Sequence, residues 1–247
     1  MGFPRLLNGS EVDTYATFTS ETTPLVGQKM VIEDGRTFRF TEAAGTALIN
    51  ARTTQSSVPV AGTKDEDLDT LAAGTRVLTG VAATGINPAA DLFKGGYVHI
   101  LTATQLGPVM AIRSNTLFAS NVGTLTLFND LPIAIAVGDK CTYVESPFRD
   151  VILTPTTPTA PVVGIVTVAV SANEYGWLAT GGPARVLTEG TLVISNGVMP
   201  SDGTTGAVED WVPETDVATG VMNQPLGVCM LAKANAEKSP IFLRLEA

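Results

Sequence analysis

Few residues in this sequence of 247 residues can carry acid–base or metal chemistry. His99 is the single histidine, so zinc sites that need two or more histidines are excluded. A Ser-His-Asp triad would have to recruit His99, but the sequence has no Gly-x-Ser-x-Gly elbow. In the run YVHIL, His99 shares a strand face with Tyr97 and Leu101, which favours a packed strand histidine over a catalytic base.

Nucleotide and glycoside chemistry find little support either. The sequence lacks both the Gly-x-x-x-x-Gly-Lys-Ser/Thr phosphate loop and the Gly-x-Gly-x-x-Gly fingerprint. Paired carboxylates for glycoside hydrolysis stay open, because such residues meet only in the folded chain. Aromatic residues make up only 6% of the chain, however, and carbohydrate sites usually need aromatic platforms. We expect a protein that is not an enzyme and that binds no cofactor and no metal.

The densest group of carboxylates, Asp65-Glu66-Asp67-Leu68-Asp69, superficially matches a calcium-binding loop. An EF-hand that began at Asp65 would need Gly at its sixth position and Glu at its twelfth. The sequence has Thr70 and Arg76 at these positions. We therefore interpret the run as a solvated acidic turn.

The two cysteines, Cys141 and Cys229, each lie within an apolar run. We interpret both as buried free thiols that act as small hydrophobic side chains. A disulfide would require their Cα atoms to lie within about 7 Å, which spacing along the chain does not establish.

The charge balance argues against several classes of partner. The chain has 24 acidic and 15 basic residues and a net charge of −9, with no clustered basic stretch. Nucleic-acid binding and attachment to an anionic membrane surface both favour such a stretch, so we expect neither partner. No apolar run reaches the roughly 18 to 20 residues of a transmembrane helix. The N-terminus lacks the apolar core of a secretory signal, so we expect no export by a signal peptide.

The elements that position these residues are expected to be strands. Hydrophobic residues make up 45% of the chain, which supports a packed core, and 24 Gly and 15 Pro supply many turns. From about residue 74 to residue 153, short apolar runs alternate with turn residues, a spacing typical of a β-sandwich or barrel. The runs are TRVLTGVA, GGYVHILTA, PVMAIRS, GTLTLF, PIAIAV, KCTYV and RDVIL.

The N-terminal part is expected to hold an arm and a hairpin. Residues 1 to about 26 have little periodicity, which indicates an extended arm that orders only against a partner. In QKMVIEDGRTFRFT, Asp34-Gly35 suits a two-residue type I′ turn, and apolar positions alternate on both flanks. These positions are Met30, Ile32, Phe38 and Phe40. For residues 41–60, a short helix and an extended connector fit the sequence about equally.

Two apolar hairpins are expected in the C-terminal part, over residues 161–182 and 224–247. In both, Pro is followed within three residues by Gly and an apolar run, then by a polar break and a second apolar run. Gly164 and Gly227 are therefore predicted at close backbone approaches or bulges. The run EYGWLAT is expected to stop at Gly181-Gly182-Pro183.

The proline-rich segment LTPTTPTAP, residues 153–161, is predicted to be a semi-rigid connector between two β modules. The expected fold is mainly β, with two β-sandwich or barrel-like modules and an extended N-terminal arm. The expected division is an N-terminal arm and hairpin over residues 1–60, a middle β module over 61–153 and a C-terminal β module over 154–247.

A set of segments spread over residues 28–247 shares a recognisable style. They are GRTFRFTEAAGTAL, GGYVHI followed by GPVMAIRSN, GIVTVAVSANEYGWLATGGPARVL, and TLVISNG with QPLGVCMLA and FLRLEA. Together they resemble the capsid decoration, or cement, proteins of tailed bacteriophages, and the C-terminal part is similar to the small trimeric head-stabilising proteins. The resemblance implies a structural protein on the outer capsid surface of a virion, made in the host cytoplasm. It also implies a homotrimer that binds the major capsid protein and stabilises the shell against internal pressure.

The capsid contact is expected in the N-terminal arm, through β-addition or apolar contact. The predicted apolar anchors are Phe3, Leu6, Leu7, Tyr15 and Phe18. An alternative places the contact on the second module and leaves the N-terminus facing solvent. Two other functions stay open: a fibre, spike or baseplate component of the virion, and a carbohydrate-binding β-sandwich.

Overall fold

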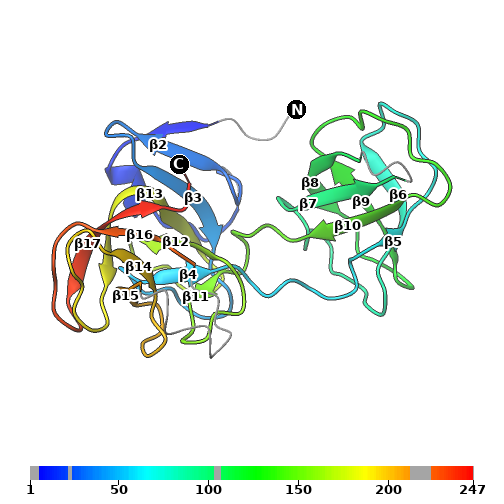
Figure 1. Cartoon of the computed structure of the whole chain (residues 1–247). Helices are drawn as coiled ribbons and strands as arrows, with labels where there is room; N and C mark the ends of the chain where they lie inside the picture. Colours follow the sequence, from blue (N-terminus) through cyan, green and yellow to red (C-terminus); the bar gives the residue numbers. More distant parts are fainter. Residues whose placement is uncertain (1–5, 22–23, 103–106, 212–223, 247) are drawn as a thin grey trace. The chain divides into compact units, whose positions relative to one another are not determined.

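A computed structural model describes residues 6–21, 24–102, 107–211 and 224–246 of the chain. Apart from one 3-10 turn, η1 (Val12–Tyr15), the regular elements of these residues are all β-strands. The chain forms two compact units, each with its own sheet (Figure 1). Each unit also buries its own hydrophobic side chains. The expected mainly β fold with sandwich- or barrel-like modules is therefore confirmed.

The two units divide the chain at other places than the sequence predicts. Among the described residues, the barrel unit comprises those of 59–146, and the large-sheet unit combines those of 6–58 with those of 147–246. In the expected division, residues 1–60 stand apart and the later boundary falls at residue 153. The structure instead inserts the barrel unit as a single excursion into the large-sheet unit.

The proline-rich segment 153–161 is a loop within the large-sheet unit. It joins strands β11 (Ile152–Leu153) and β12 (Val162–Val166), and both strands pair with β4 (Thr53–Gln55). The side chain of Gln55 donates to the Thr159 hydroxyl (2.8 Å) and accepts from the Thr159 N–H (3.2 Å). Proline prevents this segment from joining the sheet, but a side chain of β4 fixes it in place.

The barrel unit is a six-stranded antiparallel sheet that nearly closes on itself. Its strand order is β5-β10-β7-β8-β9-β6. The bounds are β5 (Glu66–Asp67), β6 (Val77–Ala82), β7 (Tyr97–Leu101), β8 (Val109–Asn115), β9 (Val122–Leu127) and β10 (Lys140–Val144). Just after β5, the Asp69 N–H donates to the Thr79 carbonyl of β6 (3.1 Å), so the two outer strands lie close and leave little free edge.

The core of the barrel unit is aromatic at its centre. Tyr143 packs edge-on against Phe93 at 4.8 Å between ring centroids, and its hydroxyl donates to the Ala82 carbonyl (2.6 Å). The run PIAIAV, residues 132–137, is predicted as a strand, but it forms only a single bridge between Ile135 and Leu71. Here the Asp139 carboxylate accepts a hydrogen bond from the Ala136 N–H (2.9 Å). This N–H is therefore used within a turn and cannot donate to a neighbouring strand.

The large-sheet unit contains the other eleven strands. Its main path is β1-β2-β3-β13-β17-β16-β14-β15, and β4, β11 and β12 join it beside β13. The bounds not yet given are β1 (Leu7–Gly9), β2 (Lys29–Ile32), β3 (Thr37–Glu42), β13 (Tyr175–Leu187), β14 (Gly197–Pro200), β15 (Val208–Asp210), β16 (Gly227–Cys229) and β17 (Lys238–Arg244).

Strand β13 runs through the glycines that are predicted to stop it. Its first half pairs with β3, and from Gly181 onward it pairs with β17. A register shift lies between Ala179 and Gly181, and Gly182 has a φ of 87°. Gly182 therefore bends the strand and lets it exchange partners, because glycine adopts this conformation without a steric penalty.

Both predicted C-terminal hairpins form, as β12–β13 and β16–β17. A Cβ atom at Gly164 would lie 2.6 Å from Leu178 Cβ, and one at Gly227 would lie 2.0 Å from the Phe242 carbonyl oxygen. A register shift also occurs between Val162 and Gly164. The predicted close approaches at both glycines are confirmed.

The hairpin predicted around Asp34-Gly35 joins β2 and β3, but its turn differs from the prediction. Only Gly35 has a positive φ (85°), whereas a type I′ turn needs a positive φ at both central residues. The Gly35 N–H donates to the Ile32 carbonyl (2.9 Å), and the Ile32 N–H donates to the Arg36 carbonyl (3.2 Å). This is a three-residue loop with a glycine bulge, and it still buries the alternating side chains.

The N-terminal segment is part of the large-sheet unit, so the prediction of a separate extended arm is wrong for the residues described. Strand β1 pairs in parallel with β2, and Phe18 bridges to Tyr175 of β13. The Phe18 ring also contacts the Phe40 ring edge-on, with 5.4 Å between centroids. For residues 41–60, the extended alternative is correct: the segment contains β4 and no helix.

Candidate interaction site

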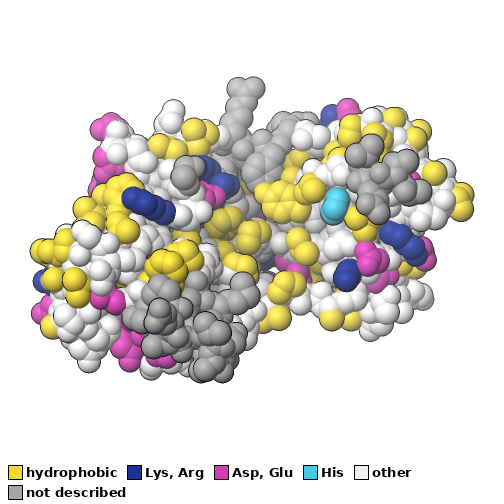
Figure 2. Space-filling model, in the orientation of Figure 1, with side chains coloured by type: hydrophobic (Ala, Val, Ile, Leu, Met, Phe, Trp, Pro, Cys, Tyr) yellow, Lys and Arg dark blue, Asp and Glu magenta, His cyan; other side chains and the backbone are white. Residues whose placement is uncertain are grey.

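The single histidine lies on the outer surface of the barrel unit, so its prediction as a packed residue is wrong. Strand side chains alternate, and Val98 and Ile100 occupy the core face of β7, which places His99 in solvent. Figure 2 shows the histidine at the surface with hydrophobic side chains beside it. The exposed hydrophobic residues on neighbouring positions of this face are Tyr97, Val109 and Val144.

The acidic run is a strand edge rather than a solvated turn. Glu66 in β5 is buried, and its carboxylate accepts the Thr84 N–H (3.2 Å). The next residue, Asp67, is exposed and forms an ion pair with Lys140 of β10. Within the described part of the chain, no cluster of three or more His, Cys, Asp or Glu side chains could hold a metal ion. No helix in these residues is long and apolar enough to cross a membrane.

Both cysteines are buried free thiols, as predicted. Burial raises the pKa of the Cys141 thiol to about 12. At pH 8 we therefore expect Cys141 to resist iodoacetamide in the native protein, because the thiolate is the reactive form. Alkylation in urea followed by peptide mass mapping supplies the control. Rapid labelling of Cys141 without denaturant would contradict this prediction.

The structure describes four of the five predicted contact residues and separates them into two groups. Leu7 and Phe18 pack against the core of the large-sheet unit, so they are structural. Leu6 and Tyr15 are exposed, at 55% and 56% of their full surface. Phe3 lies outside the described residues. Among the anchors that the structure describes, Leu6 and Tyr15 are therefore the two placed to contact a partner.

The turn η1 is attached to the sheet at two points. Glu11 forms an ion pair with Arg36, which follows the hairpin loop and also pairs with Asp34. At the other end of η1, the Thr167 hydroxyl donates to the Thr14 carbonyl (2.8 Å). These contacts fix the N-terminal segment over the bend of β13.

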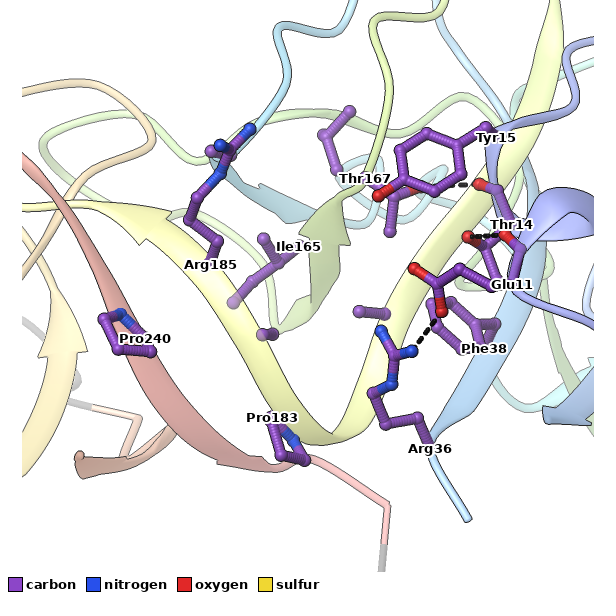
Figure 3. Close-up of a pocket in the computed structure, with 14 residues that line it drawn as sticks. Glu11, Thr14, Tyr15, Arg36, Phe38, Ile165, Thr167, Pro183, Arg185 and Pro240 are labelled. Carbon is purple, nitrogen blue, oxygen red and sulfur yellow. Dashed lines mark hydrogen bonds and ion pairs between the residues drawn. The ribbon is translucent and has the colours of Figure 1, made fainter. Parts of the chain in front are cut away.

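Between η1 and the bend of β13 lies a pocket of about 380 Å³, which we call the β13 pocket (Figure 3). Buried apolar side chains form its floor: Phe38, Ile165, Val166 and Ala179. Figure 3 shows the Glu11–Arg36 pair on one side of Ile165, Arg185 on the other, and Tyr15 beside Thr167. The pocket therefore combines an apolar floor with charged walls.

A largely buried ion-pair cluster joins three parts of the large-sheet unit. Arg149 contacts Glu21 of the N-terminal segment (2.8 Å) and Glu42 of β3. Its side chain is 12% exposed, and those of Glu21 and Glu42 are 8% and 16% exposed. Glu42 also accepts from the Tyr175 hydroxyl (3.1 Å), and burial raises the pKa of Glu42 above its usual value. The cluster is structural, because its polar groups satisfy one another.

Four exposed hydrophobic side chains gather on two adjacent loops of the large-sheet unit. Val193, Ile194, Met230 and Leu231 are 51%, 53%, 44% and 49% exposed, and we call them the loop patch. The loops lie side by side because the Ser195 N–H donates to the Cys229 carbonyl (3.0 Å) and the Leu192 N–H to the Lys233 carbonyl (3.0 Å). Exposed apolar side chains gathered on neighbouring loops are typical of protein–protein contact sites.

The sequence predicts neither the loop patch nor the β13 pocket. The runs TLVISNG and GVCML give a partial signal, since each has more consecutive apolar residues than one buried strand face can use. The pocket gives no signal, because its walls come from segments far apart in the chain. No protein-family model, no curated protein and no solved structure matches this chain.

Proposed function

We propose that this chain is a non-enzymatic structural protein of a tailed-phage virion, which binds the major capsid protein on the outer surface and stabilises the shell. The segments that resemble decoration proteins motivate the proposal. The β-rich fold is compatible with it. The loop patch is the observation that carries it, because it offers an apolar surface to another protein.

The loop patch is better suited to the capsid contact than the N-terminal segment is. Of the predicted anchors, Leu7 and Phe18 are committed to the chain's own core. The patch instead joins four exposed side chains on loops held together by backbone hydrogen bonds. Loops fixed on a rigid sheet suit recognition, because little entropy is lost when they bind. We therefore favour a contact on the large-sheet unit, with homotrimer formation as part of the same proposal.

The double variant Ile194→Ser/Leu231→Ser should weaken binding to expanded capsids of the parent virus by about tenfold or more, or about 1.4 kcal/mol. The reason is the loss of apolar area that only the complex buries. Cosedimentation with capsids measures the affinity, and the capsid melting temperature measures stabilisation. Val137→Ser is the matched control, since Val137 is 93% exposed in the barrel unit and outside the patch.

The outcomes separate the parts of the proposal. Unchanged capsid binding by the double variant would refute the patch assignment, and Leu6→Ser/Tyr15→Ser would then test the N-terminal contact. Native mass measurement of both proteins shows whether the patch instead joins copies of the chain: a trimer that the double variant loses would place the patch in that interface. If the unaltered protein neither binds nor stabilises capsids, the cement function is wrong.

A further inference from the structure

Strand β13 continues beyond the point where the antiparallel strand β3 begins, so part of one edge of β13 has no strand partner. Gly181 lies opposite Thr37, the first residue of β3, and the later residues of β13 have no partner in β3. At the far end of this edge, the Leu187 N–H donates to the Ala51 carbonyl (2.8 Å). Pro183, Ala184 and Arg185 lie between these two points and line the β13 pocket. The open edge is therefore a wall of the pocket.

Arg185 directs its backbone N–H and carbonyl toward this open edge. Its opposite residue in β17 is Pro240, which has no N–H and whose carbonyl accepts from Met230 on the other side (3.1 Å). Alternate residues of an antiparallel strand direct their backbone groups to alternate edges, and Leu187 bonds away from β17. The backbone N–H and carbonyl of Arg185 must therefore point to the same edge of β13 as those of Leu187. Among the described residues, none hydrogen-bonds to its backbone N–H or carbonyl.

The guanidinium of Arg185 is also free within the described part of the chain. The other arginine of the pocket, Arg36, is neutralised by Glu11 and Asp34. Arg185 is exposed and forms no ion pair with the residues described. One residue thus offers a main-chain donor, a main-chain acceptor and a positive charge, next to an apolar floor. An extended peptide with a carboxylate side chain has the complementary groups.

We propose that the open edge of β13 binds an extended peptide segment of a partner protein, with an acidic residue opposite Arg185 and an apolar residue on each side of it. The acidic residue accepts from the Arg185 N–H and donates to its carbonyl, as an added antiparallel strand does. Opposite residues project to the same face of a sheet, so the carboxylate reaches the guanidinium.

The apolar floor of the pocket suits the two residues that flank the acidic residue in the peptide. They project to the opposite face from the acidic residue. On that face of β13 lies Ala184, which lines the pocket and packs against the core. The floor residues Ile165 and Phe38 complete this apolar surface. The recognised pattern is therefore apolar–acidic–apolar, and the inference does not rest on the proposed capsid function.

The test uses the full chain and an acetylated, amidated pentapeptide, Thr-Val-Glu-Val-Thr, followed by amide NMR. We expect saturable shifts at Gly182–Leu187, and binding about two- to fivefold weaker when the peptide Glu is replaced by Gln. N-methylation of the same Glu removes the donor to the Arg185 carbonyl, and should weaken binding by about fivefold or more. Arg185→Glu should reverse the preference in favour of Thr-Val-Lys-Val-Thr. Arg244→Gln is the control, since Arg244 lies over Phe242 outside the pocket.

Three results would overturn the proposal. The first is the absence of saturable shifts with the Glu peptide. The second is equal affinity for the N-methylated peptide, which would exclude strand addition. The third is that glutarate alone produces the same shifts with the same affinity, which would identify a small-anion site. Arg185→Glu must keep the tryptophan fluorescence of the unaltered protein, and Arg185→Gln replaces it if it does not.

Discussion

Replacing Gly227 with alanine is expected to destabilise the large-sheet unit by about 3 kcal/mol, at the upper end of the cost of overpacking a core. The new Cβ atom would lie 2.0 Å from the Phe242 carbonyl oxygen and 3.1 Å from Leu243 Cα. Both are backbone atoms of the paired strand β17, so no side-chain rotation relieves the clash. The hairpin β16–β17 must open, and this removes contacts from the centre of the sheet.

Urea unfolding followed by tryptophan fluorescence measures this effect. Both tryptophans, Trp177 and Trp211, belong to the large-sheet unit, so the barrel unit does not contribute to the signal. A loss of about 3 kcal/mol corresponds to a fall of roughly 6 to 12 °C in melting temperature.

Gly45→Ala is the matched control for this substitution. A Cβ atom at Gly45 meets nothing within 4 Å, and its φ is not positive. This change should leave stability equal or slightly higher, because alanine restricts the unfolded chain. Equal stability of Gly227→Ala and Gly45→Ala would show that β16 and β17 can separate enough to admit a methyl group at little cost.

The sequence predicts those parts of the fold that depend on local patterns. Gly164 and Gly227 are recognisable because a glycine inside an apolar run has few other uses than a close backbone approach. The alternation of Met30 and Ile32 with Phe38 and Phe40 identifies a hairpin whatever its turn type. The type of turn is not determined by these residues, since Asp34-Gly35 fits both a type I′ turn and a three-residue loop.

Long-range pairing is the part that local patterns do not predict. The N-terminal segment lacks amphipathic periodicity, yet the free edge of β2 gives Leu7–Gly9 backbone partners and Phe40 gives Phe18 a surface. Similarly, Gly181-Gly182-Pro183 is a stop signal only for an isolated strand. In the sheet, β17 supplies partners beyond the bend, and the strand continues.

The candidate sites are harder to predict than the fold for the same reason. The loop patch needs two loops, separated by more than thirty residues, to meet through backbone hydrogen bonds. The open edge of β13 exists only because β3 begins at Thr37 and has nothing to offer the residues beyond Gly181. The side chains of one segment do not indicate where a neighbouring strand, distant in the sequence, begins or ends.

Replacing Arg149 with methionine is expected to cost the large-sheet unit about 3–5 kcal/mol at pH 7, the usual cost of leaving a buried partner charge uncompensated. Glu21 and Glu42 would then share a largely buried site without their cation. The same fluorescence measurement applies. Lys233→Met is the control, because the Lys233–Glu237 pair lies in the same unit but is more exposed, at 34% and 51%, and such pairs contribute little.

The stability lost in Arg149→Met should depend on pH in a defined direction. Burial already raises the pKa of Glu42, and Arg149 opposes this rise, so removing Arg149 raises the pKa further. A carboxyl group whose pKa is raised in the folded state favours folding below its ordinary pKa. It loses that contribution as the pH rises through the folded-state pKa. The penalty of Arg149→Met should therefore be largest at neutral pH and should shrink as the pH falls toward 4.5, the ordinary value for glutamate.

A triple variant separates charge from packing in this cluster. In Arg149→Met/Glu21→Gln/Glu42→Gln, the amide oxygens can still accept from the Val26 N–H and the Tyr175 hydroxyl, but no buried charge remains. Replacing a whole buried ion cluster often leaves folding stability unchanged, whereas removing one partner lowers it. We therefore expect the triple variant to regain most of the stability that the single variant loses, and to show little change with pH. If the triple variant is as unstable as the single one, the arginine stabilises the unit by packing and hydrogen bonding rather than by charge.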